Sequence, residues 1–253
     1  NERDRRMTIL LTPFMSCGAK LPVYALFTAA FFPGNQAVCV LSLYLLGMLM
    51  MVTVGLVLRK TAFRRGDTPF VMELPNYRMP TVKNVSRRLW DRAKDFLTRA
   101  GTIIFAMSVV VWFLQSFSPD FRMVADSAES IFGGLGAFIA PVFGPLGFGE
   151  WEKSVALLAG TVAKEAVVST MQVLYSAASP GQLSAVLVGK FTPLSAYSFM
   201  VFTLLYVPCV SAIAAIRREI GSARYTLLSI GIQLGVAYVA SLLVYQIGRL
   251  IVG

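Results

Sequence analysis

Residues 7–33 read MTILLTPFMSCGAKLPVYALFTAAFFP, an apolar run long enough to cross a bilayer that nevertheless holds a lysine and several prolines. A proline has no backbone N–H to donate, so Pro13 and Pro22 each interrupt the helical hydrogen bonds and bracket the Ser-Cys-Gly sequence at 16–18. In hydrocarbon the freed carbonyls must find a partner, which can be a neighbouring helix, a water-filled cavity or a bound ion. The stretch therefore predicts a membrane helix that is broken near mid-depth, beside a thiol.

Composition places the whole chain in the membrane. Of its 253 residues, 56% are hydrophobic and only 14% are charged, and the mean hydropathy is +0.67, outside the range of ordinary soluble domains. No run shows the alternation of an outer-membrane strand. We expect an all-α fold, a polytopic transmembrane helical bundle of about seven spans, some of them broken. The predicted spans are residues 7–33, 36–58, 100–117, 131–149, 154–178, 196–216 and 225–247.

The basic residues indicate how the spans are oriented. The net charge is +10, and 11 of the 23 Lys and Arg fall between Arg59 and Arg99, between apolar runs. This pattern is typical of loops on the cytoplasmic side and argues against nucleic acid as a partner. Counting spans outward then places the start of the chain and Arg217/Arg218 on the same side, with the acidic loop 118–130 opposite. The Gly/Pro-rich run 131–149 predicts a broken or partly re-entrant span.

The segment 59–99 is expected to end in an amphipathic helix. From Thr81 onward apolar residues recur every three or four positions while basic residues fill the other positions, which is typical of a helix lying in a membrane interface. The alternative ligand of its basic face is a soluble partner domain, and anionic lipid is the simpler expectation.

Two further stretches carry residues that hydrocarbon disfavours. Lys164 and Glu165 lie in GTVAKEAVVST (160–170), near the middle of an apolar run. Intramembrane ionisable residues are by default functional, although a structural salt bridge is the alternative. In LLYVPCV (204–210) Pro208 frees the carbonyl of Leu204 beside Cys209, and the alternative there is an ordinary proline kink with a buried thiol.

Together these signals favour an ion or solute site near the membrane midplane. Sulfur with carboxylate or carbonyl oxygen suits a borderline transition-metal dication better than sodium or magnesium, and the chain contains no histidine. No catalytic residue is predicted. The predicted metal ligands are Cys17, Cys209 and Glu165, with the thioether of Met15 as a further donor. The predicted transport path or gate comprises Ser16, Cys17, Gly18, Lys164, Glu165, Pro208 and Cys209.

At these residues the sequence resembles the transmembrane region of the ferrous iron transport protein B family, FeoB. The resemblance rests on TILLTPFMSCGAKLPVYALF (8–27), TPFVMELPNYRMP (68–80), GTVAKEAVVSTMQVLY (160–175) and LYVPCVSAIAAIRRE (205–219). It implies the permease part of a GTP-dependent Fe²⁺ importer of the bacterial inner membrane, not an enzyme. It also implies paired Gate repeats in inverted topology, with Cys17 and Cys209 as iron ligands or gate residues. The domains implied are the end of a first repeat at 1–58, a cytoplasmic segment at 59–99 and a second repeat at 100–253.

The same resemblance sets the expected cofactors and partners. No G-x-x-x-x-G-K-[S/T] stretch is present, so GTP and Mg²⁺ are expected to bind an N-terminal GTPase domain outside this chain, while Fe²⁺ is the substrate. The expected partners are that domain, a small cytoplasmic accessory protein of iron transport and membrane lipids, and a homo-oligomer is left open. Two alternatives stand: a Gate-type transporter of another solute such as a nucleoside, and a membrane anchor subunit that transports nothing. The anchor hypothesis predicts that neutralising Lys164 and Glu165 leaves activity intact.

Overall fold

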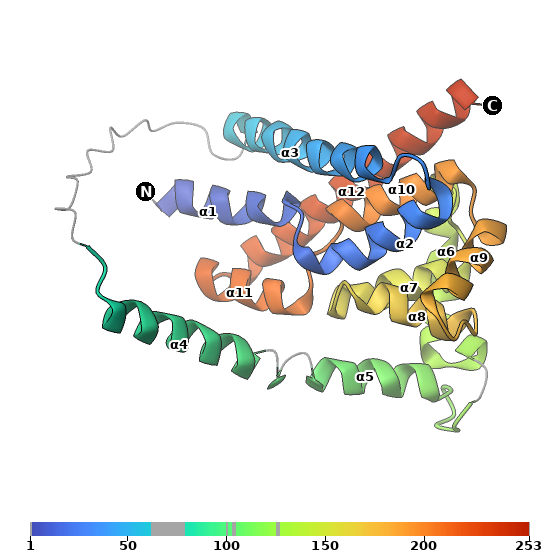
Figure 1. The fold of residues 1–253 in the computed structure, drawn as a ribbon, viewed down its shortest axis with the longest axis horizontal. Helices are drawn as coiled ribbons and strands as arrows, with labels where there is room; N and C mark the ends of the chain where they lie inside the picture. Colours follow the sequence, from blue (N-terminus) through green and yellow to red (C-terminus); the bar gives the residue numbers. More distant parts are fainter. Residues whose placement is uncertain (1, 62–78, 100, 103–104, 125–126, 253) are drawn as a thin grey trace.

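The computed structural model describes residues 2–61, 79–99, 101–102, 105–124 and 127–252 (Figure 1). Within these residues every named element is a helix, and the only strand-like pairing is an isolated bridge between Phe117 and Met123. The all-α prediction is confirmed. The expectations placed on residues 62–78 lie outside the described part of the chain.

The predicted count of about seven spans is not confirmed. By length and composition, four stretches among the described residues could cross a membrane: Asp4–Phe31, Gln36–Thr61, Pro193–Ile220 and Ala223–Ile251. A fifth is a broken pair, Ile131–Leu146 and Trp151–Val162, bent by 103°. This bend lies between the spans predicted at 131–149 and 154–178, so the two helices count as one broken span or a re-entrant loop. The apolar helix α5 (Phe105–Ser116) is shorter than the other candidates.

The first span is broken where its prolines predict. Helix α1 (Glu2–Leu11) passes into the short turn η1 (Thr12–Phe14), and the chain resumes with η2 (Gly18–Lys20) and α2 (Leu21–Phe31). Between the two turns the backbone is extended at Met15 and at Cys17. Residues 15–17 therefore interrupt the helix beside the thiol, as expected.

Two more breaks occur in the second half of the chain. Helix α10 (Pro193–Leu205) begins at a capping box of Thr192 and Ser195 and stops ahead of Pro208, and α11 (Val210–Ile220) follows after a four-residue gap. Helix α7 (Trp151–Val162) is separated from α8 (Ala166–Leu174) by residues 163–165. Lys164 and Glu165 thus occupy a break rather than the middle of one continuous helix.

The long helices pack side by side with α10 inside the bundle, where ten of its side chains are buried. Around it lie α2, α3 (Gln36–Thr61) and α12 (Ala223–Val252), while α6 (Ile131–Phe143) packs on α7 and α9 (Pro180–Lys190) packs on α2. Figure 1 shows the start of α1, the end of α3 and the turn from α11 to α12 at one end of the bundle, with residues 117–124 at the other. This arrangement agrees with the predicted placement of the basic ends on one side.

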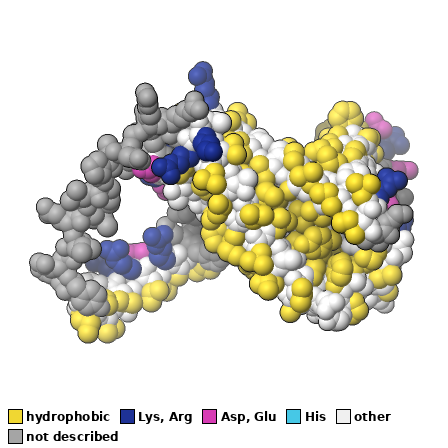
Figure 2. Space-filling model, turned by 90° about the horizontal axis from the view of Figure 1, so that it is seen from above, with side chains coloured by type: hydrophobic (Ala, Val, Ile, Leu, Met, Phe, Trp, Pro, Cys, Tyr) yellow, Lys and Arg dark blue, Asp and Glu magenta, His cyan; other side chains and the backbone are white. Residues whose placement is uncertain are grey.

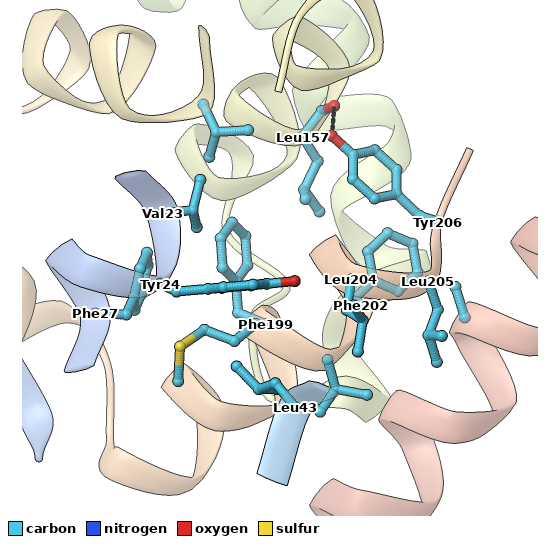
Figure 3. Close-up of a cluster of buried hydrophobic side chains, with 14 of the residues drawn as sticks. Val23, Tyr24, Phe27, Leu43, Leu157, Phe199, Phe202, Leu204, Leu205 and Tyr206 are labelled. Carbon is cyan, nitrogen blue, oxygen red and sulfur yellow. Dashed lines mark hydrogen bonds between the residues drawn. The ribbon is translucent and has the colours of Figure 1, made fainter. Parts of the chain in front are cut away.

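Aromatic rings hold α10 to its neighbours. The ring centroid of Phe199 lies 5.2 Å from that of Phe27 on α2, and Phe202 stacks on Tyr206 at 5.5 Å (Figure 3). Phe199 also lies 5.3 Å from Phe148, centroid to centroid. These buried rings fix the last turn of α10, from which the broken segment 206–209 departs. The aromatic cluster therefore holds α10 in place next to the break that Pro208 causes.

Candidate functional site

Two lysines join the three helix breaks. The Nζ of Lys20, at the end of the turn η2 that follows the first break, donates to the backbone oxygen of Leu204 at 2.6 Å. This is the carbonyl that Pro208 leaves without its helical N–H partner. The Nζ of Lys164, in the second break, donates to the oxygen of Val207 at 2.7 Å. Both side chains are buried, so the segment 204–207 is bound by ammonium groups from two other parts of the chain.

Tyr206 shapes the same region. The Nζ of Lys164 lies 3.1 Å from the centroid of the Tyr206 ring, and the Tyr206 hydroxyl donates to the oxygen of Leu157 at 3.3 Å (Figure 3). A cation over an aromatic face gains more electrostatic energy when the pair is buried, as Lys164 and Tyr206 are. A Cβ at Gly160 would overlap the Tyr206 hydroxyl and Val167. Glycine at 160 therefore allows α7 to approach the ring closely.

Both predicted thiols line one cavity of about 380 Å³ beside these lysines. Cys17 is exposed within the described chain, and Cys209 is half-buried with its Sγ 3.0 Å from the Oγ of Ser211. Met15, 55% exposed, lines the same cavity. The full lining is Ile9, Thr12, Pro13, Met15, Cys17, Lys20, Lys164, Tyr206, Pro208, Cys209, Ala212, Ala215, Ile216 and Glu219.

The other predicted path residues are distributed unevenly. Glu165 is exposed and does not line this cavity, although its neighbour Lys164 does. Gly18 is exposed, with open space where a side chain would be. The Oγ of Ser16 is buried and has no hydrogen-bond partner in the structure. The structure thus brings Cys17, Lys164, Pro208 and Cys209 together and leaves Glu165 outside.

Three lining residues with ionisable side chains were absent from the predicted set: Lys20, Tyr206 and Glu219. Glu219 supplies the carboxylate of the cavity from the last turn of α11. Its spacing from Ala212, Ala215 and Ile216 places all four on one helical face, so this periodicity could have identified it. Lys20 carries the signal of a lysine inside an apolar run, whereas the position of Tyr206 depends on tertiary packing.

The cavity lining supplies soft donor atoms, but its described residues do not form a complete set of metal ligands. Within the described residues no group of three or more His, Cys, Asp or Glu could hold a metal ion. The cavity has two thiols, a thioether and one carboxylate. The side-chain nitrogens of Lys20 and Lys164 donate hydrogen bonds to the carbonyls of Leu204 and Val207. Because the metal ligand is the thiolate, two bound thiolates would supply negative charge against these two ammonium groups. This set of donors suits transient coordination of a borderline dication.

Broken apolar helices around a shared cavity define a multi-pass membrane protein with the discontinuous helices common among transporters. The model for the ferrous iron transport protein B C terminus matches residues 40–92, and the Gate model, described as nucleoside recognition, matches residues 97–223. The chain belongs to the ferrous iron transport protein B family and contains its Gate domain. No solved structure matches it.

Curated relatives match along almost the entire chain. The Fe(2+) transporter FeoB of Staphylococcus aureus (strain COL) is 46% identical over 252 residues, which cover 100% of this chain and 38% of that protein. The Fe(2+) transporter FeoB of Methanocaldococcus jannaschii is 37% identical over 261 residues, covering 99% and 38%. An Fe(2+) transport protein A/Fe(2+) transporter FeoB fusion protein of Porphyromonas gingivalis is 35% identical over 298 residues, covering 99% and 35%. The chain therefore spans little more than a third of the length of these relatives.

Proposed function

We propose that this chain is the membrane permease part of a GTP-dependent ferrous iron importer, and that Fe²⁺ crosses the membrane by way of the cavity between the three helix breaks. The observation that carries the proposal is the meeting of Cys17 and Cys209, distant in sequence, in one cavity beside a proline-interrupted helix. Membership of the FeoB family and relatives named Fe(2+) transporter support iron as the substrate.

In this proposal the two thiols contact the ion in turn, with Met15 and Glu219 nearby. Sulfur donors favour a borderline dication over Mg²⁺ or Ca²⁺, which prefer oxygen. Glu165 would reach the ion only after the 163–165 break rearranges, because its side chain lies outside the cavity. Ser16 and Gly18 flank Cys17 at the break and would form part of the path next to its thiol.

Lys20 and Lys164 act as positioning residues that substitute for the ion. Each lysine donates a hydrogen bond to a backbone carbonyl that could otherwise coordinate a cation. Unpaired carbonyls are costly in a buried site, so the lysines stabilise the break while no metal is present.

In this proposal the other components of the transporter lie outside this chain. GTP and Mg²⁺ bind a GTPase domain of the same protein, on the cytoplasmic side of a bacterial inner membrane, where the start of this chain and residues 59–99 also lie. A small cytoplasmic accessory protein is a further partner. The fusion protein of Porphyromonas gingivalis, which joins an Fe(2+) transport protein A to a FeoB transporter, supports that pairing.

Metal-dependent thiol protection tests the proposal. The full-length protein that contains this chain is alkylated anaerobically with Fe²⁺, Zn²⁺, Mn²⁺ or no metal, and each cysteine is quantified by mass spectrometry. We expect Fe²⁺ to slow modification of both Cys17 and Cys209. Cys39, buried on α3 and outside the cavity, is the internal control and should not change. Protection of neither cavity thiol contradicts the proposed path.

The Gate description also raises a nucleoside as substrate. The described cavity lining contains no Asn or Gln, and Lys164 already covers the face of its only aromatic ring, Tyr206. Nucleoside sites need stacking faces and amide groups, so this cavity favours the ion. Protection of the thiols by a nucleoside, with none by Fe²⁺, would reverse the choice.

A further inference from the structure

Helix α4 (Val82–Arg99) leaves its apolar side chains uncovered. Every side chain described on this helix is exposed, and the exposed fractions reach 83% at Val82, 65% at Leu89, 70% at Trp90 and 68% at Leu97. Figure 2 shows hydrophobic side chains along one side of this helix and Lys and Arg on another. The described part of the chain does not bury this face, so something else must cover it in water.

The charges of α4 are ordered around its axis. At about 100° per residue, Val82, Val85, Leu89, Trp90, Ala93 and Leu97 form one stripe. Lys83, Arg87 and Lys94 follow one border of that stripe, and Arg88 and Arg92 follow the other. Asp91 and Asn84 lie on the side opposite the stripe. Basic residues therefore flank the apolar face on both sides, while Asp91, the acidic residue of the helix whose side chain is described, lies on the opposite side.

This order matches a bilayer interface better than a protein groove. Lys and Arg on both borders can lay their aliphatic stems along the acyl region and place their charges at the level of the headgroup phosphates. Asp91 then faces water, away from the anionic surface. Tryptophan at the border is also typical, because its amphipathic ring favours the headgroup level. A protein groove would match this order only if it were acidic along both of its edges.

The position of α4 in the chain holds it near such a surface. It follows α3, a candidate membrane span whose last turn carries Arg59 and Lys60, and it precedes the apolar helix α5. Tethering at both ends raises the effective concentration of the helix at the membrane. We propose that α4 docks on an anionic leaflet through its apolar stripe, with its border Lys and Arg on lipid phosphates. This proposal does not depend on iron transport.

Photocrosslinking in the full-length protein tests the proposal. Benzoylphenylalanine replaces Leu89, Leu97 or, as the polar-face control, Asn84, and the protein is reconstituted in phosphatidylcholine vesicles with or without phosphatidylglycerol. We expect phospholipid adducts from the two stripe positions when the anionic lipid is present, and few from position 84. Adducts to a protein segment at Leu89 and Leu97, or equal lipid adducts at all three positions, overturn the proposal.

Charge variants examine the electrostatic part. Neutralising a border residue, as in Lys83→Gln, Arg87→Gln or Arg92→Gln, should lower the docked-to-undocked ratio about fivefold per charge. Asp91→Asn is the matched control, because it also changes one charge on the same helix but should not weaken docking. The losses should disappear in vesicles of phosphatidylcholine alone. Adduct yields unaffected by the border variants, or lowered equally by Asp91→Asn, refute the role of the basic borders.

Discussion

Gly160→Ala should damage both the packing and the candidate site. The added Cβ would overlap the hydroxyl of Tyr206 and a methyl group of Val167. Tyr206 cannot move aside freely, because its ring is buried and stacked on Phe202 and its hydroxyl donates a hydrogen bond to the backbone oxygen of Leu157. Overpacking of this kind costs about 1–3 kcal/mol. Displacing the ring would also move the ammonium group of Lys164, which lies over it.

The expected result follows from that free energy. For a chain of this size about 1 kcal/mol lowers the melting temperature by about 2–4 °C, so Gly160→Ala should melt about 2–12 °C below the unmodified protein in detergent. Alkylation of Cys209 should also change in rate, since Val207 and Tyr206 lie next to it in the broken segment. Gly189→Ala, on α9 with open space around its Cβ, is the matched control and should not melt earlier. Equal melting and equal Cys209 reactivity in Gly160→Ala would refute this reasoning.

Three other changes separate structural from functional contacts. Ser241→Ala removes the buried hydroxyl that bonds Ser198, and should lower the free energy of unfolding by about 1–3 kcal/mol in thermal melts without altering Fe²⁺ protection of the thiols. Lys20→Met leaves the Leu204 carbonyl without its donor, and should speed alkylation of Cys209; an unchanged rate would remove Lys20 from the site. Lys153→Met removes another buried lysine, bonded to Lys190 outside the cavity, and should reduce melting temperature but not Fe²⁺ protection.

The proline-directed breaks could be predicted from sequence because their cause is local. Pro13 and Pro208 lack the N–H that the helix needs, so interruptions near 15–17 and 206–209 follow from the residue type alone. The free carbonyl of Leu204 was predictable for the same reason. Its partner was not, since the bond from Lys20 joins residues at opposite ends of the chain.

The break at 163–165 and the orientation of its side chains depend on tertiary structure. It contains no proline, and its Lys164 is held by the carbonyl of Val207 on another segment. Adjacent helical residues point about 100° apart, so the sequence does not decide whether Lys164 or Glu165 faces the cavity. The hydropathy of a sequence also does not show where the chain bends. The 103° bend between Ile131–Leu146 and Trp151–Val162 is one reason why the predicted number of spans was not confirmed.

Anaerobic uptake of Fe²⁺ into proteoliposomes tests the central claim most directly. The full-length protein is compared with Cys17→Ser, Cys209→Ser and the control Cys39→Ser, whose thiol lies outside the cavity. Loss of even an outer-shell partner of a metal costs about 10–100-fold, so each cavity variant should transport at least about tenfold more slowly while melting normally. Cys39→Ser should retain its rate. Full uptake by the Cys17→Ser/Cys209→Ser double variant would contradict a thiol-lined path through the three helix breaks.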